Sequence, residues 1–202
     1  ENPLIEEFGV EDRFVVMYSG NAGLGHRFEE VLRAIERFAG HPDIFFLFVG
    51  DGPRRQEIEE FTSAAGITNF AYHDYVDREL LSYSLSVAHV HLITLKSEMA
   101  GIAAPGKLYG ILAAGRPALM VGPERSEPGH VIREYGVGTV VEPTDTGESV
   151  KAICEEIESA WRNQARCEDV GERARRVFVE RFSSEVVLEQ LEELLRDRLA
   201  DR

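Results

Sequence analysis

From Phe14 to Val141, apolar runs rich in β-branched and aromatic residues alternate with segments of helical periodicity. Near-continuous apolar character is typical of strands buried on both faces, and helices between such strands favour parallel pairing. The sequence therefore predicts an α/β fold, a Rossmann-like doubly wound parallel sheet of about six strands. The predicted strands are Phe14–Ser19, Ile44–Val49, Thr68–Tyr72, Val90–Thr94, Ala118–Val121 and Thr139–Val141.

Segments with helical periodicity, bounded by Gly, Pro or Asp, connect the predicted strands. These predicted helices are Phe28–Phe38, Arg54–Ala65, Asp77–Val87, Lys107–Ala114 and Glu127–Glu134, with Asp77 expected to cap the third. After Pro143 the strand signal ends, and three further helices are predicted, Gly147–Arg162, Cys167–Phe182 and Ser184–Leu199. We expect 1–202 to be a single Rossmann-like domain, with 13–143 as α/β core and 144–202 as a helical C-terminal extension.

Composition excludes several classes of protein. A chain of 202 residues with 44% hydrophobic content is long enough to bury its own core, and a net charge of −14 argues against nucleic acid as a partner. Cys154 and Cys167 lie outside any metal-ligand pattern, so we expect reduced thiols and no metal. No apolar stretch is long enough for a membrane span and no leader pattern opens the chain, so we expect a cytoplasmic protein. The start at Glu1, without methionine, suggests an excised domain.

The loop after the first predicted strand is rich in glycine, and ligands in open α/β sheets bind beyond the carboxyl ends of the strands. Gly20, Gly23 and Gly25 would let the backbone approach a diphosphate closely. The loop imitates a dinucleotide-binding turn, but His26 stands where the third glycine is required. No tyrosine is followed by a lysine four residues later. An NAD-dependent oxidoreductase therefore remains an alternative.

A second glycine-preceded turn carries a rare lysine. Lys107 follows Gly106 in the first turn of a predicted helix, and the chain has only two other lysines, Lys96 and Lys151. Helix N-termini present unpaired N–H groups and partial positive charge, which suit a phosphate. The segment therefore indicates a nucleotide or nucleotide-sugar site, although an ordinary strand–loop–helix joint has the same appearance. Glu98, in the preceding loop, could accept hydrogen bonds from sugar hydroxyls. The alternative is an exposed carboxylate without a role.

Several ordered motifs resemble the C-terminal domain of retaining GT-B glycosyltransferases of group 1. They are the glycine-rich first turn, Phe48-Val49-Gly50-Asp51-Gly52-Pro53, Tyr75-Val76-Asp77-Arg78-Glu79-Leu80, Ala88-His89-Val90-His91-Leu92, and the run from Lys107 to Pro117. The resemblance implies a domain that binds a nucleoside-diphosphate sugar as donor substrate without a cofactor. The acceptor would be held by an N-terminal domain that is absent from this chain, and without it the fragment is expected to be inactive.

The same resemblance implies roles for particular residues. Gly20 and Gly23 would pack against the diphosphate, and the backbone around Asp74 and Tyr75 would meet the base. Gly106, Lys107 and Leu108 would cradle phosphate. At two positions this chain differs from many members of the family, which carry a basic residue there. His26 lies where those members have a phosphate-binding lysine, and Asn21 lies where they have the arginine of the first turn.

The chain also departs from the family pattern. Many members carry a Glu-x7-Glu pair, and the matching positions here are Ile102 and Gly110. The chain instead has a Pro-x-Lys element, Pro105-Gly106-Lys107, and in this it is similar to transferases that build cell-surface polysaccharide. This similarity is compatible with peripheral membrane association of the intact protein. A hydrolysing sugar-nucleotide epimerase and a non-catalytic domain with a degenerate site remain alternatives.

Overall fold

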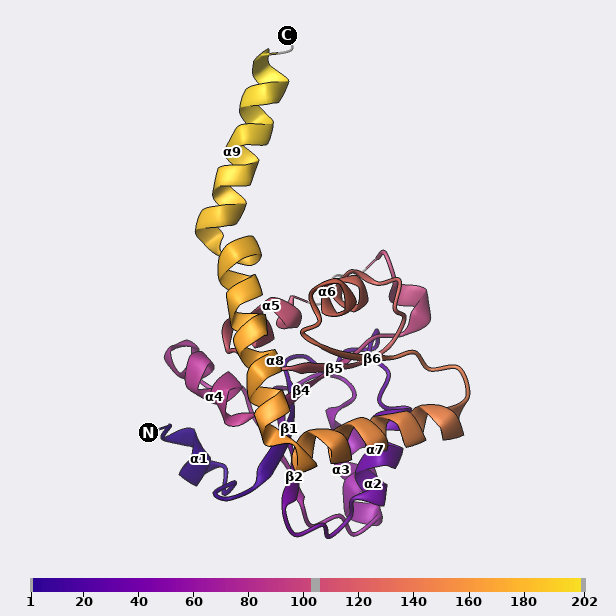
Figure 1. The fold of residues 1–202 in the computed structure, drawn as a ribbon. Coiled ribbons are helices and arrows are strands. Elements are labelled where there is room, and N and C mark those ends of the chain that lie inside the picture. The colour runs from indigo at the N-terminus through magenta and orange to yellow at the C-terminus, as the bar shows by residue number, and fades with distance from the viewer. Residues whose placement is uncertain (1, 103–105, 201–202) are drawn as a thin grey trace.

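A computed structural model describes residues 2–102 and 106–200 (Figure 1). Six parallel strands form one sheet in the order β3-β2-β1-β4-β5-β6. They are β1 (Phe14–Ser19), β2 (Ile44–Val49), β3 (Phe70–His73), β4 (Val90–Thr94), β5 (Ala118–Val121) and β6 (Gly138–Val141). The predicted α/β class and parallel sheet are therefore confirmed.

The strand order reverses at β1, which lies between β2 and β4 in the middle of the sheet. Phe14 is opposite Ile44 in β2, and Val16 is opposite both Phe46 in β2 and Val90 in β4. The chain leaves β1 toward β2 on one side and leaves β4 toward β5 on the other, so the strand order reverses between β1 and β4. Ligands of open α/β sheets bind at such a switch point.

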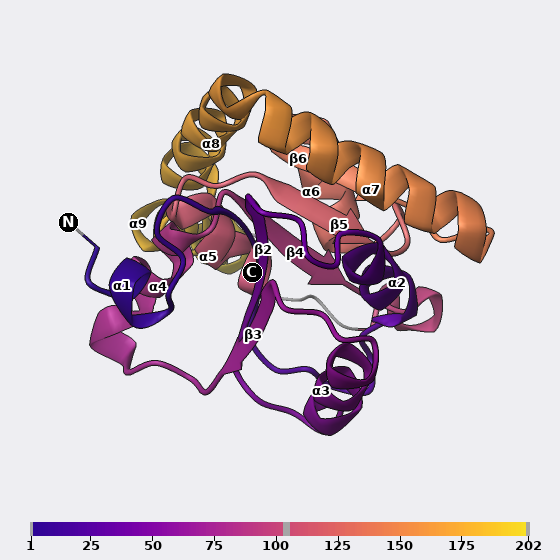
Figure 2. The same cartoon turned by 90° about the horizontal axis from the view of Figure 1, so that it is seen from below.

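Alternate residues of the strands enter different cores because successive side chains point to opposite faces. Tyr18 and Phe48 join the core under α2 (Glu29–Arg37), α3 (Arg55–Ala64) and α7 (Thr146–Arg162). Met17 lies on the other face, which α1 (Leu4–Glu7), α4 (Leu81–Val87), α5 (Lys107–Ala113), α6 (Glu127–Tyr135) and α8 (Gln164–Val177) cover. Figure 2 shows α2 and α7 on one side of the sheet and α4, α5 and α8 on the other.

The predicted C-terminal extension divides into packed and projecting parts. Helix α7 packs across α2, and α8 packs against α5 and α6, so both rest on the flanks of the sheet. After a π-helical turn at Phe178–Phe182, α9 (Ser184–Ala200) projects away from the body of the molecule (Figure 1). Its leucines Leu188, Leu191, Leu194 and Leu195 are exposed.

Local chemistry explains where several helices begin and end. Ser126 Oγ accepts from Gly129 N at 3.3 Å and caps α6, whereas Asp145 Oδ1 accepts from Gly147 N at 2.9 Å and caps α7. The expected cap at Asp77 is wrong, because its side chain makes no capping bond. The predicted helix Asp77–Val87 begins instead as a 3₁₀ turn, Arg78–Leu80, before α4. No helix within the described ranges is both long and apolar enough to cross a membrane.

Candidate functional site

Two glycine-rich loops meet at the carboxyl ends of β1 and β2. Ala22 N donates to Asp51 O at 2.7 Å, and Arg54 N donates to Ala22 O at 3.1 Å. Gly50 has φ +142°, and a Cβ at this position would overlap the carbonyl oxygen of Gly20. The glycine is therefore needed for the close approach of the two backbones, which fixes the first loop on the second.

Tyr18, the penultimate residue of β1, forms the floor under the first loop. Its side chain is fully buried, and its ring centroid lies 5.0 Å from that of Phe28 and 5.2 Å from that of Phe48. The phenol hydroxyl donates to the carbonyl oxygen of Asn21 at 2.8 Å. A buried tyrosine needs a partner for its hydroxyl, and here that partner ties the glycine-rich loop to the sheet.

Lys107 extends from the first turn of α5 onto this floor. Its Nζ lies 3.8 Å from the centroid of the Tyr18 ring, and its aliphatic stem passes beside Gly20. Although part of the residue is exposed, Nζ itself is buried and has no hydrogen-bond partner within the described part of the chain. Burial disfavours the charged form and lowers the pKa of Lys107 to about 7. The site thus contains an amine that is only partly protonated near neutral pH and that has no counter-ion among the described residues.

His26 lies beside the same floor as a neutral imidazole. Its Nδ1 is 2.6 Å from the carbonyl oxygen of Thr94 at the end of β4, and its ring is 5.9 Å from that of Tyr18. A carbonyl only accepts, so Nδ1 carries the proton and Nε2 is left as an acceptor. Burial, and then the charge of Lys107, lowers the pKa of His26 to about 4. Near neutral pH, His26 is therefore neutral, and any positive charge on these two side chains resides on Lys107.

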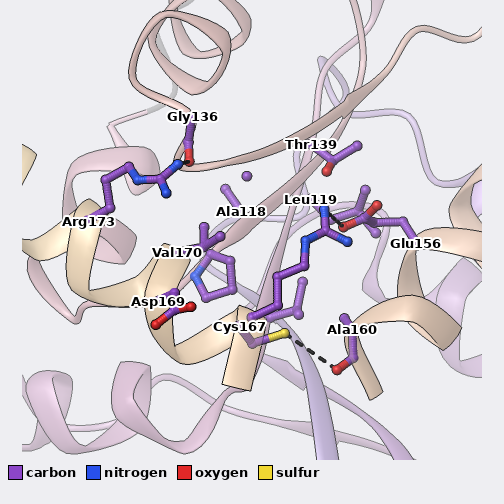
Figure 3. A pocket seen from close by; sticks show the side chains of 14 residues that line it. Ala118, Leu119, Gly136, Thr139, Glu156, Ala160, Cys167, Asp169, Val170 and Arg173 are labelled. Carbon is purple, nitrogen blue, oxygen red and sulfur yellow. Dashed lines mark hydrogen bonds and ion pairs between the residues drawn. The ribbon is translucent and has the colours of Figure 1, made fainter. Parts of the chain in front are cut away.

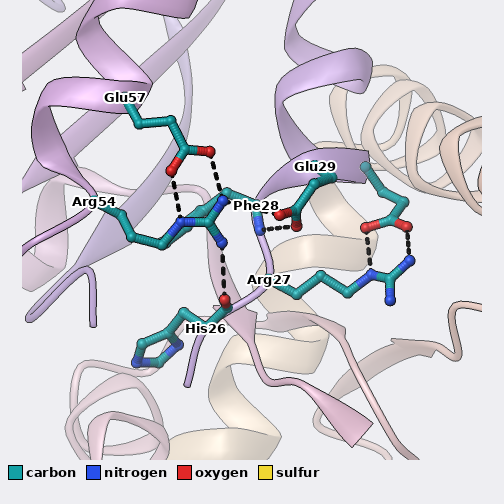
Figure 4. A network of polar contacts seen from close by, with 7 residues as sticks. His26, Arg27, Phe28, Glu29, Arg54 and Glu57 are labelled. Atoms are coloured by element: carbon teal, nitrogen blue, oxygen red, sulfur yellow. Dashed lines mark hydrogen bonds and ion pairs between the residues drawn. The ribbon is translucent and has the colours of Figure 1, made fainter. Parts of the chain in front are cut away.

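Arg54, at the start of α3, holds the far end of the loop (Figure 4). Its Nη1 donates to the carbonyl oxygen of His26 at 3.0 Å, and its Nη2 contacts Glu29 Oε1 at 2.9 Å. Nε also donates to Glu57 Oε2 at 2.9 Å. The hydrogen bonds to Glu57 outweigh burial and raise the pKa of Arg54. The guanidinium is thus bonded to other residues of the chain, and its hydrogen bond to His26 O fixes the backbone of the loop.

The other predicted site residues lie along the same edge of the sheet but do not gather around Lys107. Asp74 and Tyr75 are exposed after β3, where Asp74 forms an ion pair with Arg55. Glu98 is exposed in the 3₁₀ turn Ser97–Met99. Gly106 is exposed, whereas Leu108 is buried in the core beneath α5. Pro105, of the Pro-x-Lys element, lies outside the described residues.

Three residues that complete the site were missed by sequence reasoning. Tyr18 looks like an ordinary apolar strand position, Thr94 contributes a backbone carbonyl, and Arg54 was assigned only to the start of a helix. An aromatic residue at the last inward-facing position of the central strand is a usable signal for Tyr18. For the other two, nothing in the sequence indicates a contact with His26.

A cavity of about 270 Å³ lies at the opposite edge of the sheet (Figure 3). The amino ends of β5 and β6 line it together with α7 and α8, and Cys167 Sγ donates to Ala160 O at 3.5 Å. Burial raises the pKa of the Cys167 thiol, which disfavours the reactive thiolate. Across the described residues, no group of three or more His, Cys, Asp or Glu side chains is placed to hold a metal ion. The loops at the carboxyl edge, rather than this cavity, contain the unsatisfied cation.

Comparisons with known proteins bear on this arrangement. The WcaI protein of Escherichia coli (strain K12), assigned to colanic acid biosynthesis as a glycosyl transferase, is 28% identical over 151 residues, which are 74% of this chain and 36% of WcaI. The structure of Anabaena HepE in complex with UDP-glucose has a TM-score of 0.76 at 15% identity, over 96% of this chain and 51% of HepE. A glycosyltransferase from Rickettsia africae has a TM-score of 0.80 at 14% identity, over 98% of this chain and 52% of its own.

This chain therefore spans about a third of WcaI and about half of each of these two solved structures. Its fold is that of the Rossmann-like half of a GT-B enzyme. The family described as glycosyl transferases group 1 matches residues 4–177, nearly the whole α/β region together with α7 and α8. The chain belongs to the group 1 glycosyl transferases.

Proposed function

We propose that this chain is the nucleotide-sugar donor-binding domain of a retaining glycosyltransferase that acts in the synthesis of cell-surface polysaccharide or glycoconjugate. The proposal rests first on one observation: the buried Lys107 ammonium has no partner among the described residues and lies where two glycine-rich loops meet. A diphosphate would supply the missing negative charge. The similarity to WcaI supports the polysaccharide context, and the UDP-glucose complex of HepE supports the donor class.

In this proposal, Lys107 binds the diphosphate and stabilises the negative charge that develops on it as the glycosidic bond breaks. Gly20 and Gly23 keep side chains away from the phosphates. Helix α5 has only seven residues, so its N-terminus contributes little beside the lysine. Positive charge replaces a metal ion in this role. The base would meet the backbone at Asp74 and Tyr75.

His26 takes a different part in this proposal from the lysine that many family members carry at this position. The neutral imidazole donates its Nδ1 proton to Thr94 O, so Nε2 is an acceptor. An acceptor suits a hydroxyl of the donor better than a phosphate. Asn21 and Glu98 are exposed near the loops, and they would contact the sugar or ribose. The acceptor substrate would be held by a separate domain of a longer protein, so the chain alone would bind the donor without turning it over.

The test is a calorimetric titration of the chain with UDP, GDP, ADP and dTDP, with NAD and NADP as controls. We expect saturable binding of one diphosphate and a Kd at least ~10-fold weaker in Lys107→Ala, because a charged hydrogen bond to phosphate is lost. Binding of the matching nucleoside should change little, since the loss is at the phosphate. Lys151→Ala, on the exposed face of α7, is the matched control.

Other outcomes separate the alternatives. NAD binding would replace the donor-domain proposal with an oxidoreductase, and equal affinity of Lys107→Ala and wild type for the diphosphate would contradict the role of Lys107. In the longer protein, release of UDP from a UDP-sugar without an acceptor would indicate a hydrolysing epimerase. The failure of every diphosphate to bind would favour a degenerate, non-catalytic domain.

A further inference from the structure

Among residues 2–102 and 106–200, the side chains that face the Lys107 ammonium provide it with no negative charge. Tyr18 of β1 presents its ring, and burial raises the pKa of its phenol, so it is neutral. His26, from the loop after β1, and His91 of β4 both have pKa values lowered to about 4 by burial, so they are neutral as well. In α5 itself, the Tyr109 hydroxyl donates to the Glu127 carboxylate of α6, so that carboxylate is hydrogen-bonded to Tyr109 rather than to Lys107.

The position of the lysine over an aromatic ring is a weak substitute for a counter-ion. A cation over a tyrosine face gains about 2 kcal/mol when it is desolvated, less than the penalty for burying an ammonium without a partner. The end of the lysine side chain also lies beside Gly20, close enough for van der Waals contact with a Cβ built at that position. This arrangement positions the Lys107 amine over the ring, and burial there disfavours its protonated form.

We propose that binding of a nucleoside-diphosphate sugar draws the Lys107 amine off the Tyr18 ring and leads it to take up one proton from solvent, so that donor binding is proton-linked and Tyr18 is a positioning residue. This inference rests on the proposed donor site. The step balances as a neutral amine plus a solvent proton giving an ammonium, with no bond to the donor formed or broken. Opposite charge within about 4–6 Å favours the charged form, which is what a diphosphate would provide.

The linkage fixes the sign and size of the effect. Because the protonated amine binds the diphosphate and the free chain holds that proton only below about pH 7, affinity is highest at low pH and falls as pH rises. If the bound lysine stays protonated throughout, the Kd for the donor should rise about 25-fold between pH 6.5 and pH 8.5. At pH 7.5, binding should take up ~0.8 proton per site.

The three lysines of the chain make a direct test feasible. The chain labelled with ε-¹³C-lysine should give resonances from Lys96, Lys107 and Lys151, and Lys107→Met identifies its own signal by removing it. UDP-glucose is the first probe, because both its phosphates are diesters and do not titrate near neutral pH; GDP-mannose, ADP-glucose and dTDP-glucose follow. We expect the Lys107 signal to titrate near pH 7 in the free chain and to stay protonated to above pH 9 when the donor is bound.

The role of Tyr18 has its own readout in the same spectra. A methylene group over a tyrosine face experiences the ring current, so the Lys107 ε-protons should be shifted upfield in the free chain and return toward ordinary values on donor binding. Tyr18→Phe keeps the ring and loses the bond to Asn21, so it should retain both the upfield shift and the proton uptake. Tyr18→Leu should abolish the upfield shift and move the titration of Lys107 to lower pH.

Calorimetry in buffers of different ionisation enthalpy measures the proton uptake independently. Donor binding with no proton uptake, or a Lys107 signal that titrates identically with and without UDP-glucose, would overturn the inference and leave the donor site intact. An ordinary ε-proton shift in the free wild-type chain would overturn the role of Tyr18, even if Tyr18→Leu does not fold. If none of the four donors binds, the inference and the proposed function both fail.

Discussion

Replacing Lys107 by methionine should stabilise the chain in the absence of nucleotide. Methionine has similar length and fills the space beside Gly20 and over Tyr18 without a charge to desolvate. The lysine it replaces has its Nζ buried and without a hydrogen-bond partner among the described residues. We therefore expect the variant to lose diphosphate binding while it gains free energy of unfolding, an outcome that an ordinary core substitution does not give.

The structure sets the size of this gain. The pKa of Lys107 falls from 10.5 to about 7 in the folded chain, and each unit corresponds to about 1.36 kcal/mol. Between these values the unfolded chain binds more protons than the folded one, so stability rises with pH through this window. At pH 7 the penalty of the lysine is about 4 kcal/mol, and by pH 9.5 it falls to about 1 kcal/mol. The advantage of the methionine variant should shrink accordingly.

Urea unfolding followed by the fluorescence of Trp161, the single tryptophan, measures both free energies. Because other groups also titrate over this range, the relevant quantity is the difference between variant and wild type at each pH. Lys151→Met is the control, since the Lys151 side chain is 60% exposed and its replacement should change stability by less than ~0.5 kcal/mol. A methionine variant that is less stable at pH 7, or whose advantage does not change with pH, would refute the reasoning.

Three further predictions concern the loops around the site. Gly50→Ala should destabilise the chain by ~3 kcal/mol or more in thermal unfolding, because its Cβ would overlap Gly20; Gly66→Ala, with φ +64° and open space, should cost only about 1 kcal/mol, and equal losses would contradict the close approach. Arg54→Met should cost about 2 kcal/mol in urea unfolding because the side chain is only 9% exposed, whereas Arg33→Met breaks an exposed pair and should cost less than ~1 kcal/mol. In the longer protein, His26→Ala should lower turnover roughly tenfold with little change in the KM for the acceptor, and a defect confined to the acceptor side would count against a donor contact.

The sheet was predictable because its strands are buried on both faces. The bounds of β1, β2, β4 and β5 were predicted to the residue, since continuous β-branched and aromatic runs end at glycine or polar residues. At the edge of the sheet β3 is only half-buried, and it begins at Phe70 rather than the predicted Thr68. Helix α1 was not predicted as a helix because four residues are too few for a periodic signal.

The site was predictable only in part. Glycine spacing and the rarity of lysine indicated the loop after β1 and Lys107, since both signals are local. The contact between Lys107 and Tyr18 joins residues that are 89 positions apart, and only the strand order shows that they meet. The tautomer of His26 depends on the Thr94 carbonyl, which any residue would supply equally well. Sequence therefore indicated which cation to consider, whereas only the structure showed that the described residues give it no counter-ion.

A buried cation elsewhere in the described chain shows why Lys107 stands apart. Arg54 is buried, but it has carboxylate partners in Glu29 and Glu57. Those ion pairs explain its burial. A lysine over a ring, with no acceptor in the described residues, destabilises the fold that contains it. Such a cost is expected where a ligand completes the site, because the diphosphate then provides the interaction that the folded chain lacks.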